Sequence, residues 1–460
     1  MNADRFFENI KKNRIAVIGT GVSHRELIPQ FLKKGFDLTF LDKRSEIAEY
    51  DEYKDLGAKF ILGEHYLDSL TDFDIVFRTP GMYFGNPKLR EAVKKGVAVT
   101  SELEVFFSLC PCKTYAVTGS DGKTTTTTLI AEMLSAEGKT VHKGGNLGKA
   151  LLPIIGDIKE TDIVVCELSS FQLMSMRTSP DVAVITNISP NHLDVHGTMN
   201  EYINCKKNIL LHQNAFGKAV LNLDNADTAA LSEIVRGKCT FFSRQKKPEI
   251  FGAFLDDQNN LCYNKNGSIT AYVNAKDIKI PGVHNVENYL AAIAAVEGEV
   301  SPETVKKVAR DFGGVEHRIE FVREIDGVKY YNDSIATSPT RTIAGLRSFG
   351  RKIIVIAGGY DKKIPYEPLA EDVNKYVKCL VTLGATAPKI EDAVRGFSGY
   401  DENECKIIRV ETLEEAVEAA RREAKPGDVI SLSPASASFD LYKNFEERGA
   451  HFKKIVNGLE

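Results

Sequence analysis

The stretch from Ala116 to Thr128 constrains the fold of this chain more than any other. It passes from apolar residues through a glycine turn into Lys123 and a run of threonines. Gly119 and Gly122 lack a Cβ atom, so the backbone can curl with its N–H groups facing inward, and the lysine and hydroxyls that follow can meet phosphate and Mg²⁺. The pattern predicts a strand, a phosphate-binding loop and a helix.

This loop is shorter than the standard P-loop, which requires a glycine where the chain has Val117. The alternative interpretation is a plain strand–turn–helix whose glycines serve only the turn geometry. Lys123 and Thr124 would add nothing to a plain turn, because a cation beside a hydroxyl is needed only where phosphate is bound. The pair therefore favours a nucleotide site with its own spacing.

Length and charge limit the function classes. The 460 residues suggest about three domains. Lysine and arginine number 59 against 63 acidic residues, a formal net charge of −4 that gives no electrostatic reason to expect nucleic acid or an anionic membrane. We find no apolar run long enough to span a bilayer and no signal-type N-terminus, and the eight cysteines are interpreted as buried thiols. We expect a cytoplasmic protein with small ligands and neither nucleic-acid nor membrane partners.

The first hundred residues predict a parallel α/β unit. A strand at 15–18, a glycine turn at 19–21, a helix and a strand at 38–41 form a βαβ pattern that ends at Asp42. The third glycine of a Rossmann turn is replaced by His24, but an acid about 20 residues beyond the turn can accept a ribose hydroxyl. The pattern favours a nucleotide, and a solvated strand end is the alternative for Asp42. Alone, the turn would also allow an NAD-dependent dehydrogenase.

Polar residues follow two further apolar strands. The strand at 163–167 ends in Glu167, and the strand at 182–186 leads into a loop that contains His192. Ligands of open parallel sheets gather at the carboxyl ends of strands, so Glu167 can meet the phosphate loop if their strands are neighbours. His192 is either a metal ligand or a satisfied loop histidine. On the helix at 200–211, Lys206 and Lys207 alone indicate ordinary solvated lysines.

The remaining sequence predicts two more blocks. Residues 241–273 alternate apolar and polar side chains and predict short antiparallel strands. Asn285 either caps the helix at 287–296 or, with Asn288 on the same face, reaches a nucleotide base. Strands at 352–357, 380–383 and 429–432 alternate with helices and predict another open α/β sheet. We therefore predict an α/β protein of three domains: Rossmann-like, P-loop ATPase-like, and again Rossmann-like.

These motifs together resemble the ATP-dependent Mur ligases of peptidoglycan synthesis, over all three domains. The resemblance rests on residues 118–125 (Thr-Gly-Ser-Asp-Gly-Lys-Thr-Thr), 167–173 (Glu-Leu-Ser-Ser-Phe-Gln-Leu), 191–194 (Asn-His-Leu-Asp), 282–285 (Gly-Val-His-Asn) with Asn288, and His317-Arg318. The tail at 433–440 and 443–449 resembles the D-glutamate-adding branch, and the Asp-Asn-Pro-Arg motif of the diaminopimelate-adding branch is missing. The resemblance implies a UDP-precursor-binding domain at 1–108, an ATP-binding domain at 109–315 and an amino-acid-binding domain at 316–460.

The implied activity is that of an ATP-dependent carboxylate–amine ligase. ATP would phosphorylate the alanyl carboxylate of UDP-N-acetylmuramoyl-L-alanine, and the amine of D-glutamate would displace phosphate from the acyl phosphate, in a cell-wall pathway that serves cell shape, division and the cell cycle. Such a reaction needs cations and donors in place around the transferring phosphoryl group. Another amide ligase, such as a folylpolyglutamate synthase, and a non-catalytic nucleotide-binding relative are the alternatives. The protein would act as a monomer.

The resemblance also assigns residues. Lys123, Glu167, His192 and Lys206 would be catalytic; Thr124 and Glu167 would hold one Mg²⁺, and His192 and Lys206 a second. Lys206, four residues past Tyr202, would carry a carbamate derived from CO₂, which turns its cation into a carboxylate-like ligand. The implied ATP contacts are Gly119, Ser120, Asp121, Gly122, Lys123, Thr124, Thr125, Asn285, Asn288, Arg318 and Asp333. The implied UDP-precursor contacts are Gly19, Thr20, Gly21, Asp42, Arg44, Thr79, Gly81 and Asn146. The implied D-glutamate contacts are Thr337, Lys362, Ser438 and Phe439.

One position departs from the family pattern. The family usually has a lysine in its Asn-Asp-Ser-Lys-Ala-Thr motif, and this chain has Ile335 at that position. Losing a cation near the reacting carboxylates weakens charge stabilisation there. Lys362 and Lys363 are the candidates to compensate for the missing cation.

Overall fold

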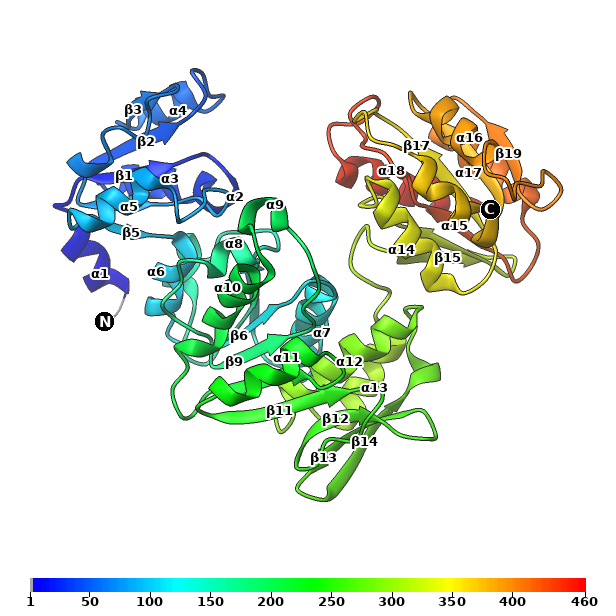
Figure 1. Cartoon of the computed structure of the whole chain (residues 1–460), viewed down its shortest axis with the longest axis horizontal. Coiled ribbons are helices and arrows are strands. Elements are labelled where there is room, and N and C mark those ends of the chain that lie inside the picture. Colours follow the sequence, from blue (N-terminus) through cyan, green and yellow to red (C-terminus); the bar gives the residue numbers. More distant parts are fainter. Residues whose placement is uncertain (1–2) are drawn as a thin grey trace. The chain divides into compact units, whose positions relative to one another are not determined.

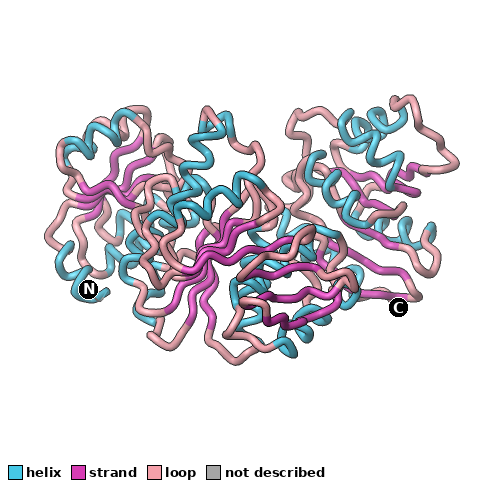
Figure 2. The backbone as a smooth tube through the Cα atoms, turned by 60° about the horizontal axis from the view of Figure 1, so that its bottom comes forward, coloured by secondary structure: helices cyan, strands magenta, loops and turns pink. Residues whose placement is uncertain are grey.

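The computed structural model describes residues 3–460, which form three sheets covered by helices (Figures 1 and 2). The chain divides into two compact units. The first contains the residues up to Ala275 together with Val286–Val308, and the second contains Lys276–Asn285 together with Ala309–Glu460. None of the helices described for residues 3–460 is long and apolar enough to cross a membrane.

The first sheet has five parallel strands in the order β3-β2-β1-β4-β5. The central strand β1 (Ile15–Ile18) is buried along its whole length, as its uninterrupted apolar sequence predicts for a parallel sheet. The other strands are β2 (Leu38–Asp42), β3 (Lys59–Leu62), β4 (Ile75–Phe77) and β5 (Ala98–Thr100). The helices are α1 (Ala3–Ile10), α2 (Val22–Arg25), α3 (Leu27–Lys33), α4 (Tyr50–Asp55), η1 (Leu70–Asp72), α5 (Pro87–Lys94) and α6 (Glu102–Leu109). The single helix expected after the glycine turn is thus divided at Glu26.

The second sheet has nine strands in the order β14-β13-β12-β11-β10-β9-β6-β8-β7. Its parallel strands are β6 (Lys113–Thr118), β7 (Val141–Gly145), β8 (Ile163–Glu167), β9 (Val182–Ile185), β10 (Lys218–Asn222), β11 (Lys238–Ser243) and β12 (Phe251–Leu255). Only β13 (Asn260–Lys265) and β14 (Ser268–Asn274) add antiparallel pairs. The prediction of antiparallel strands throughout 241–273 is therefore wrong for β11, because its partners β10 and β12 both run parallel to it.

Helices flank this second sheet. They are α7 (Lys123–Ala136), η2 (Leu152–Asp157), α8 (Ser170–Leu173), α9 (Leu193–His196), α10 (Met199–Leu211), α11 (Ala226–Ala230), η3 (Leu231–Ile234), η4 (Ala275–Asp277), α12 (Val283–Val296) and α13 (Pro302–Asp311). Helix α12 begins before Asn285, so this asparagine lies inside the helix and the prediction that it caps a helix starting at 287 is wrong.

The third sheet has six strands in the order β15-β16-β20-β17-β18-β19. They are β15 (Glu320–Ile325), β16 (Val328–Asn332), β17 (Ile353–Gly358), β18 (Val377–Leu383), β19 (Lys406–Arg409) and β20 (Val429–Leu432). Only the β15–β16 pair is antiparallel, about the predicted turn at 326–327. The helices are α14 (Pro339–Phe349), α15 (Glu367–Tyr376), α16 (Ala387–Arg395), α17 (Leu413–Glu423) and α18 (Phe445–Asn457). The predicted second open α/β sheet is confirmed.

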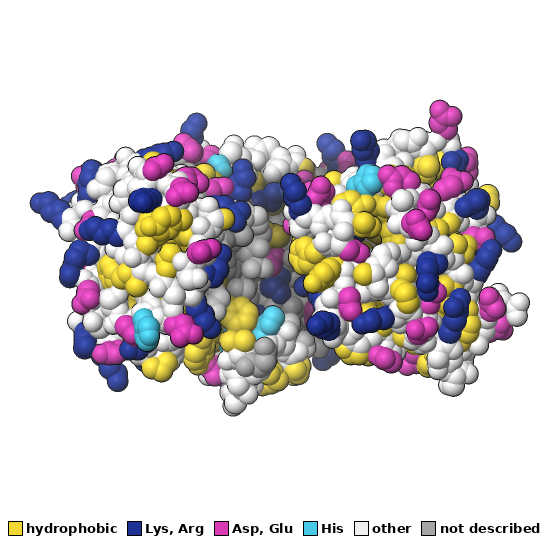
Figure 3. Space-filling view, turned by 90° about the horizontal axis from the view of Figure 1, so that it is seen from above, with side chains coloured by type: hydrophobic (Ala, Val, Ile, Leu, Met, Phe, Trp, Pro, Cys, Tyr) yellow, Lys and Arg dark blue, Asp and Glu magenta, His cyan; other side chains and the backbone are white. Residues whose placement is uncertain are grey.

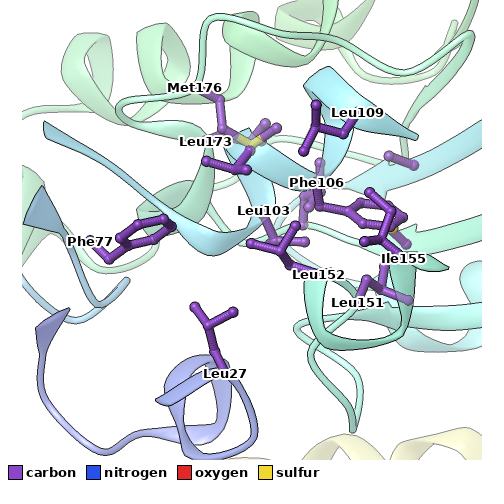
Figure 4. Close-up of a cluster of buried hydrophobic side chains, with 14 of the residues drawn as sticks. Leu27, Phe77, Leu103, Phe106, Leu109, Leu151, Leu152, Ile155, Leu173 and Met176 are labelled. Carbon is purple, nitrogen blue, oxygen red and sulfur yellow. The ribbon is translucent and has the colours of Figure 1, made fainter. Parts of the chain in front are cut away.

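One apolar core joins the first two sheets. Figure 4 shows Leu103 and Phe106 of α6 beside Leu152 of η2, and the same cluster includes Leu27 and Phe77 of the first sheet's layer. Each fully buried side chain of this size stabilises the fold by about 1.5–3 kcal/mol. Helix α6, which leads out of the first domain, is therefore part of a shared core, and this explains why the first two predicted domains form one compact unit.

Candidate functional site

The predicted phosphate loop connects β6 to the amino end of α7. Gly119 has φ 151°, and a Cβ atom there would lie 1.9 Å from the hydroxyl oxygen of Thr186. Gly122 has φ 76°, and a Cβ atom there would lie 2.4 Å from the amide oxygen of Asn288. Both positions therefore require glycine for conformation and for space. The Lys123 ammonium donates a hydrogen bond to the Ser120 carbonyl at 2.9 Å, so the Lys123 side chain folds back onto the loop.

Glu167 stands at the carboxyl end of β8, directly beside the loop. Strands β6 and β8 pair in parallel, so the expected neighbourhood of Glu167 and the loop is confirmed. The Thr124 hydroxyl donates to one Glu167 carboxylate oxygen at 2.6 Å, and the Asn146 amide donates to the other at 2.7 Å. Glu167 is only 2% exposed. A buried carboxylate beside a hydroxyl offers the oxygen ligands that Mg²⁺ prefers, so these residues fit the implied metal.

Lys206 of α10 is buried beneath the same loop. Its ammonium donates to the Gly119 carbonyl at 2.8 Å and to the Thr118 hydroxyl at 3.3 Å, and it lies 4.6 Å from the ring centre of Tyr202. It is 1% exposed, so the interpretation as an ordinary solvated lysine is wrong. Burial, assisted by the nearby charge of Lys123, lowers the pKa of Lys206 to about 7.

His192 precedes α9 and has a left-handed backbone with φ 54°. Its exposed ring makes an edge contact with the ring of Phe171, with 5.1 Å between the ring centres. Phe171 lies in α8, two residues after Ser169, which caps that helix. Within residues 3–460, no three His, Cys, Asp or Glu side chains form a metal-binding group. A second metal held by His192 and a modified Lys206 stays a prediction.

The residues predicted to bind the UDP end lie at the carboxyl ends of β1, β2 and β4. The Arg44 guanidinium contacts both carboxylate oxygens of Asp42, at 2.9 and 2.7 Å, and the Thr20 hydroxyl at 3.0 Å. Burial raises the pKa of Asp42, but the hydrogen bonds and charge of Arg44 outweigh this effect and the pKa is lowered overall. The Gly19 backbone lies against the Thr79 side chain, since a Cβ atom on Gly19 would be in ordinary van der Waals contact with the Thr79 methyl group at 3.6 Å. This cluster keeps the carboxylate of Asp42 ionised.

His24, which replaces the third Rossmann glycine, is completely buried under the turn. Its Nδ1 lies 3.0 Å from the Ile18 carbonyl oxygen and 3.1 Å from that of Gly19, so Nδ1 carries the proton and donates. Burial lowers the pKa of His24 to about 4, which keeps the ring neutral. His24 thus has a structural role at this position, because its ring holds the glycine turn against the end of β1.

Arg78 was missed by sequence reasoning, because no motif singles out an arginine before a Thr-Pro-Gly turn. Its guanidinium is buried and donates to the carbonyls of Thr79, Pro80 and Met82, at 3.2, 3.3 and 2.7 Å. It also donates to the Phe171 carbonyl at 3.1 Å and the Ser175 hydroxyl at 2.8 Å. Arg78 therefore fixes the turn that contains Thr79 and Gly81 onto α8, next to Glu167.

The other predicted ATP contacts are divided between the two units. Asn288 belongs to the first unit, where its amide oxygen accepts from the Thr126 hydroxyl at 3.2 Å. Asn285, Arg318 and Asp333 belong to the second. The buried Asp333 carboxylate accepts from the Ser433 hydroxyl at 2.9 Å, and burial raises its pKa to about 7. Their ATP contacts stay predictions.

The predicted D-glutamate contacts lie on loops at the carboxyl ends of β16, β17 and β20. The Lys362 ammonium donates to the Thr337 carbonyl and hydroxyl at 3.2 and 3.3 Å. Ser438 is buried, whereas Phe439 is 63% exposed and its ring meets Tyr360 edge-on at 5.9 Å. The structure thus places these four residues in neighbouring loops of one sheet edge.

Comparison with known families defines the class of protein. A model of the Mur ligase middle domain matches residues 117–296, one of the Mur ligase glutamate ligase domain matches 317–436, and one of the MurD-like N-terminal domain of Mur ligases matches 13–101. The chain belongs to the Mur ligase family.

Among its relatives, the UDP-N-acetylmuramoylalanine–D-glutamate ligase of Acetivibrio thermocellus is 53% identical over 99% of this chain and 98% of its own length. The enzyme of the same name from Ruminiclostridium cellulolyticum is 50% identical over 99% of each chain. The solved UDP-N-acetylmuramate-alanine ligase of Thermotoga maritima superposes with a TM-score of 0.57 at 20% identity, covering 97% of this chain and 99% of its own. This last likeness supports the three-domain α/β fold.

Proposed function

We propose that the chain is an ATP-dependent ligase that adds D-glutamate to UDP-N-acetylmuramoyl-L-alanine in peptidoglycan precursor synthesis. The observation that carries this proposal is the hydrogen bond of 2.6 Å between the half-buried Thr124 and the buried Glu167, beside a glycine loop that requires both of its glycines. Identities of 46–53% to full-length ligases of that name support the choice of substrates.

The residues on the loop are suited to catalyse phosphoryl transfer. The Lys123 ammonium and the amino end of α7 would neutralise the phosphates of ATP as the γ-phosphoryl group moves to the alanyl carboxylate. Thr124 and Glu167 would hold Mg²⁺, which would supply positive charge to the phosphates. The amine of D-glutamate would then attack the acyl phosphate and release phosphate.

We propose that Lys206 is carbamylated in the active protein. The reaction joins the neutral amine nitrogen to the carbon of CO₂ and releases one proton, so it needs an amine that is uncharged near neutral pH. Burial of Lys206 provides such an amine. A carbamylated nitrogen keeps one N–H, which can still donate to the Gly119 carbonyl that Lys206 contacts at 2.8 Å. The new anion, together with His192, would provide a second Mg²⁺ site.

The remaining assignments are part of the same proposal. They are the ATP contacts of Asn285, Asn288, Arg318 and Asp333, the UDP contacts at the Asp42–Arg44 cluster, the domain boundaries near 108 and 315, and a monomeric, cytoplasmic protein. On the face seen in Figure 3, basic and acidic side chains are interspersed over the surface, which agrees with small ligands rather than a polyanion.

The direct test combines the purified protein with ATP, Mg²⁺, bicarbonate, UDP-N-acetylmuramoyl-L-alanine and D-glutamate. We expect phosphate release that requires every component, and a product heavier than the nucleotide substrate by one glutamyl residue. Replacing D-glutamate with L-lysine, or the nucleotide substrate with a folate, is the control. Turnover with a folate and L-glutamate, and none with the nucleotide substrate, would contradict the proposal.

A further inference from the structure

A cluster of three cations surrounds the segment 334–337 in the second compact unit. The Arg341 guanidinium donates to the Ile335 carbonyl at 3.2 Å, and the Lys362 ammonium donates to the Thr337 carbonyl at 3.2 Å. The Thr337 N–H also donates to the Ile335 carbonyl, at 2.8 Å. Arg341 and Lys362 are therefore attached to the two ends of one tight turn.

Arg448 holds the base of this turn. Its buried guanidinium donates to the Ser334 hydroxyl at 3.0 Å and to the Ser334 carbonyl at 2.9 Å. Burial lowers the pKa of Lys362, and the charges of Arg341 and Arg448 lower it further. The three positive charges are thus close enough to repel one another in the free protein.

The acidic residues nearby are engaged elsewhere. Asp361 pairs with Lys389 at 2.6 Å, and Asp440 accepts from the Ala385 N–H at 3.4 Å. The buried Asp333 accepts from Ser433; the charge of Arg341 acts on its pKa, but the structure describes no hydrogen bond between the two side chains. Within residues 3–460, no carboxylate lies at ion-pair distance from Arg341 or Lys362. On the same helix as Arg341, by contrast, Arg347 is held by Asp372 at 2.7 and 2.8 Å.

We propose that Arg341 is a specificity-determining residue that binds one carboxylate of the incoming D-glutamate, while Lys362 binds the other carboxylate. This inference rests on the proposed function. Two exposed cations fixed to one turn match a dicarboxylate, and a guanidinium can bind a carboxylate through two parallel hydrogen bonds. The middle of the turn carries the apolar Ile335, so Arg341 is the cation that this segment offers beside Lys362.

The test compares Arg341→Gln and Arg341→Lys with Arg347→Gln, which removes the same charge from the same helix. Steady-state kinetics with D-glutamate, ATP and UDP-N-acetylmuramoyl-L-alanine separates the three KM values, and thermal melts verify the fold of each variant. We expect Arg341→Gln to raise the KM for D-glutamate about 10- to 100-fold, since a hydrogen bond to a charged group is lost. In Arg341→Gln we expect the KM values for ATP and for UDP-N-acetylmuramoyl-L-alanine to stay within about twofold of those of the original chain. In Arg347→Gln we expect the same of all kinetic constants.

Two further measurements distinguish a binding role from a structural one. The preference for D-glutamate over D-glutamine should fall in Arg341→Gln, and guanidinium ions added to Arg341→Ala should restore part of the lost affinity for D-glutamate. An unchanged KM for D-glutamate, or equal rises in all three KM values, would overturn the assignment of Arg341. Failure of the unsubstituted chain to use D-glutamate at all would overturn the proposed function, and this inference with it.

Discussion

Lys206 and Lys218 lie near opposite ends of the strands of the second sheet, and both have a lowered pKa. Burial lowers the pKa of each to about 7. Lys206 is beneath the phosphate loop at the carboxyl end of β6, where it donates to the Gly119 carbonyl. Lys218 begins β10, at the amino ends of the strands, where it donates to the Ala295 carbonyl of α12 at 3.1 Å. The fully buried Lys206 and the half-buried Lys218 thus have a similarly lowered pKa at two unrelated places.

The surroundings of the two lysines separate their chemistry. Near Lys218 stand Glu297 and Glu299, which pair with Lys238, Lys265 and Lys113. A carbamate on Lys218 would be a third anion beside these two carboxylates, and the neighbouring cations Lys238 and Lys113 are already paired with them. Lys206 lies near Lys123, and also near the carboxylates of Asp121 and Glu167. A new anion there would be stabilised by Lys123 and by the Mg²⁺ that Glu167 is proposed to hold. A neutral lysine is thus necessary for carbamylation, and bound Mg²⁺ would make the carbamate persist.

The largest expected effect separates the two lysines by activity. Lys206→Met should lower kcat at least about 1000-fold, because the anion proposed to hold the second Mg²⁺ cannot form. Lys218→Met should keep kcat within about threefold, because its side chain lies at the other end of the sheet. Phosphate release at saturating substrates measures both. Comparable losses of kcat in the two variants would contradict a specific catalytic role for Lys206.

The carbamate itself should be visible on one lysine alone. Protein equilibrated with ¹³C-bicarbonate should give one carbamate resonance, absent in Lys206→Met and retained in Lys218→Met. The signal should grow between pH 6 and pH 8, because the amine of Lys206 loses its proton around pH 7. A resonance that disappears only in Lys218→Met would reverse the assignment.

The stability of the chain should reveal the burial of Lys218 through its pH dependence. At pH 6 this lysine is charged in the folded and unfolded states, so the folded state bears the whole cost of burying the charge. Between about pH 7 and 10.5 the unfolded chain holds the proton and the folded chain does not, so stability rises with pH. Lys218→Met lacks this dependence, and its free energy of unfolding relative to the original chain should be about 2–3 kcal/mol more favourable at pH 6 than at pH 9. Denaturant titrations at both pH values check this, and an equal difference at both would contradict it.

The smallest expected effect concerns the carboxylates beside Lys218. Glu297 raises the pKa of Lys218, so Glu297→Gln should lower that pKa further, by about half a unit to one unit at this partly buried position. An NMR titration of the lysine ε-methylene group measures the change. No carbamate should appear on Lys218 in this variant, because Glu299 remains. Its appearance would show that one carboxylate alone prevents the modification.

Much of the fold was predictable because its signals are local. The apolar strands at 15–18 and 163–167, the glycine turns and the end of α7 before Gly138 follow from residue type and spacing. The direction in which β11 pairs was not predictable, because a strand with alternating side chains looks the same in a parallel and an antiparallel pair. Helix α12 begins earlier than expected, and the Asn285 side chain donates to the Pro281 carbonyl from within the helix.

The sequence by itself determined the phosphate loop, the carboxylate at the end of β8 and the membership of a ligase family, because each depends on short motifs. Only the tertiary structure decided which lysine of the pair on α10 is buried, that Arg78 fixes the Thr-Pro-Gly turn onto α8, and that Arg341 and Lys362 share one turn. Burial and charge pairing arise from segments far apart in the chain, so they become defined only when the sheets and helices pack.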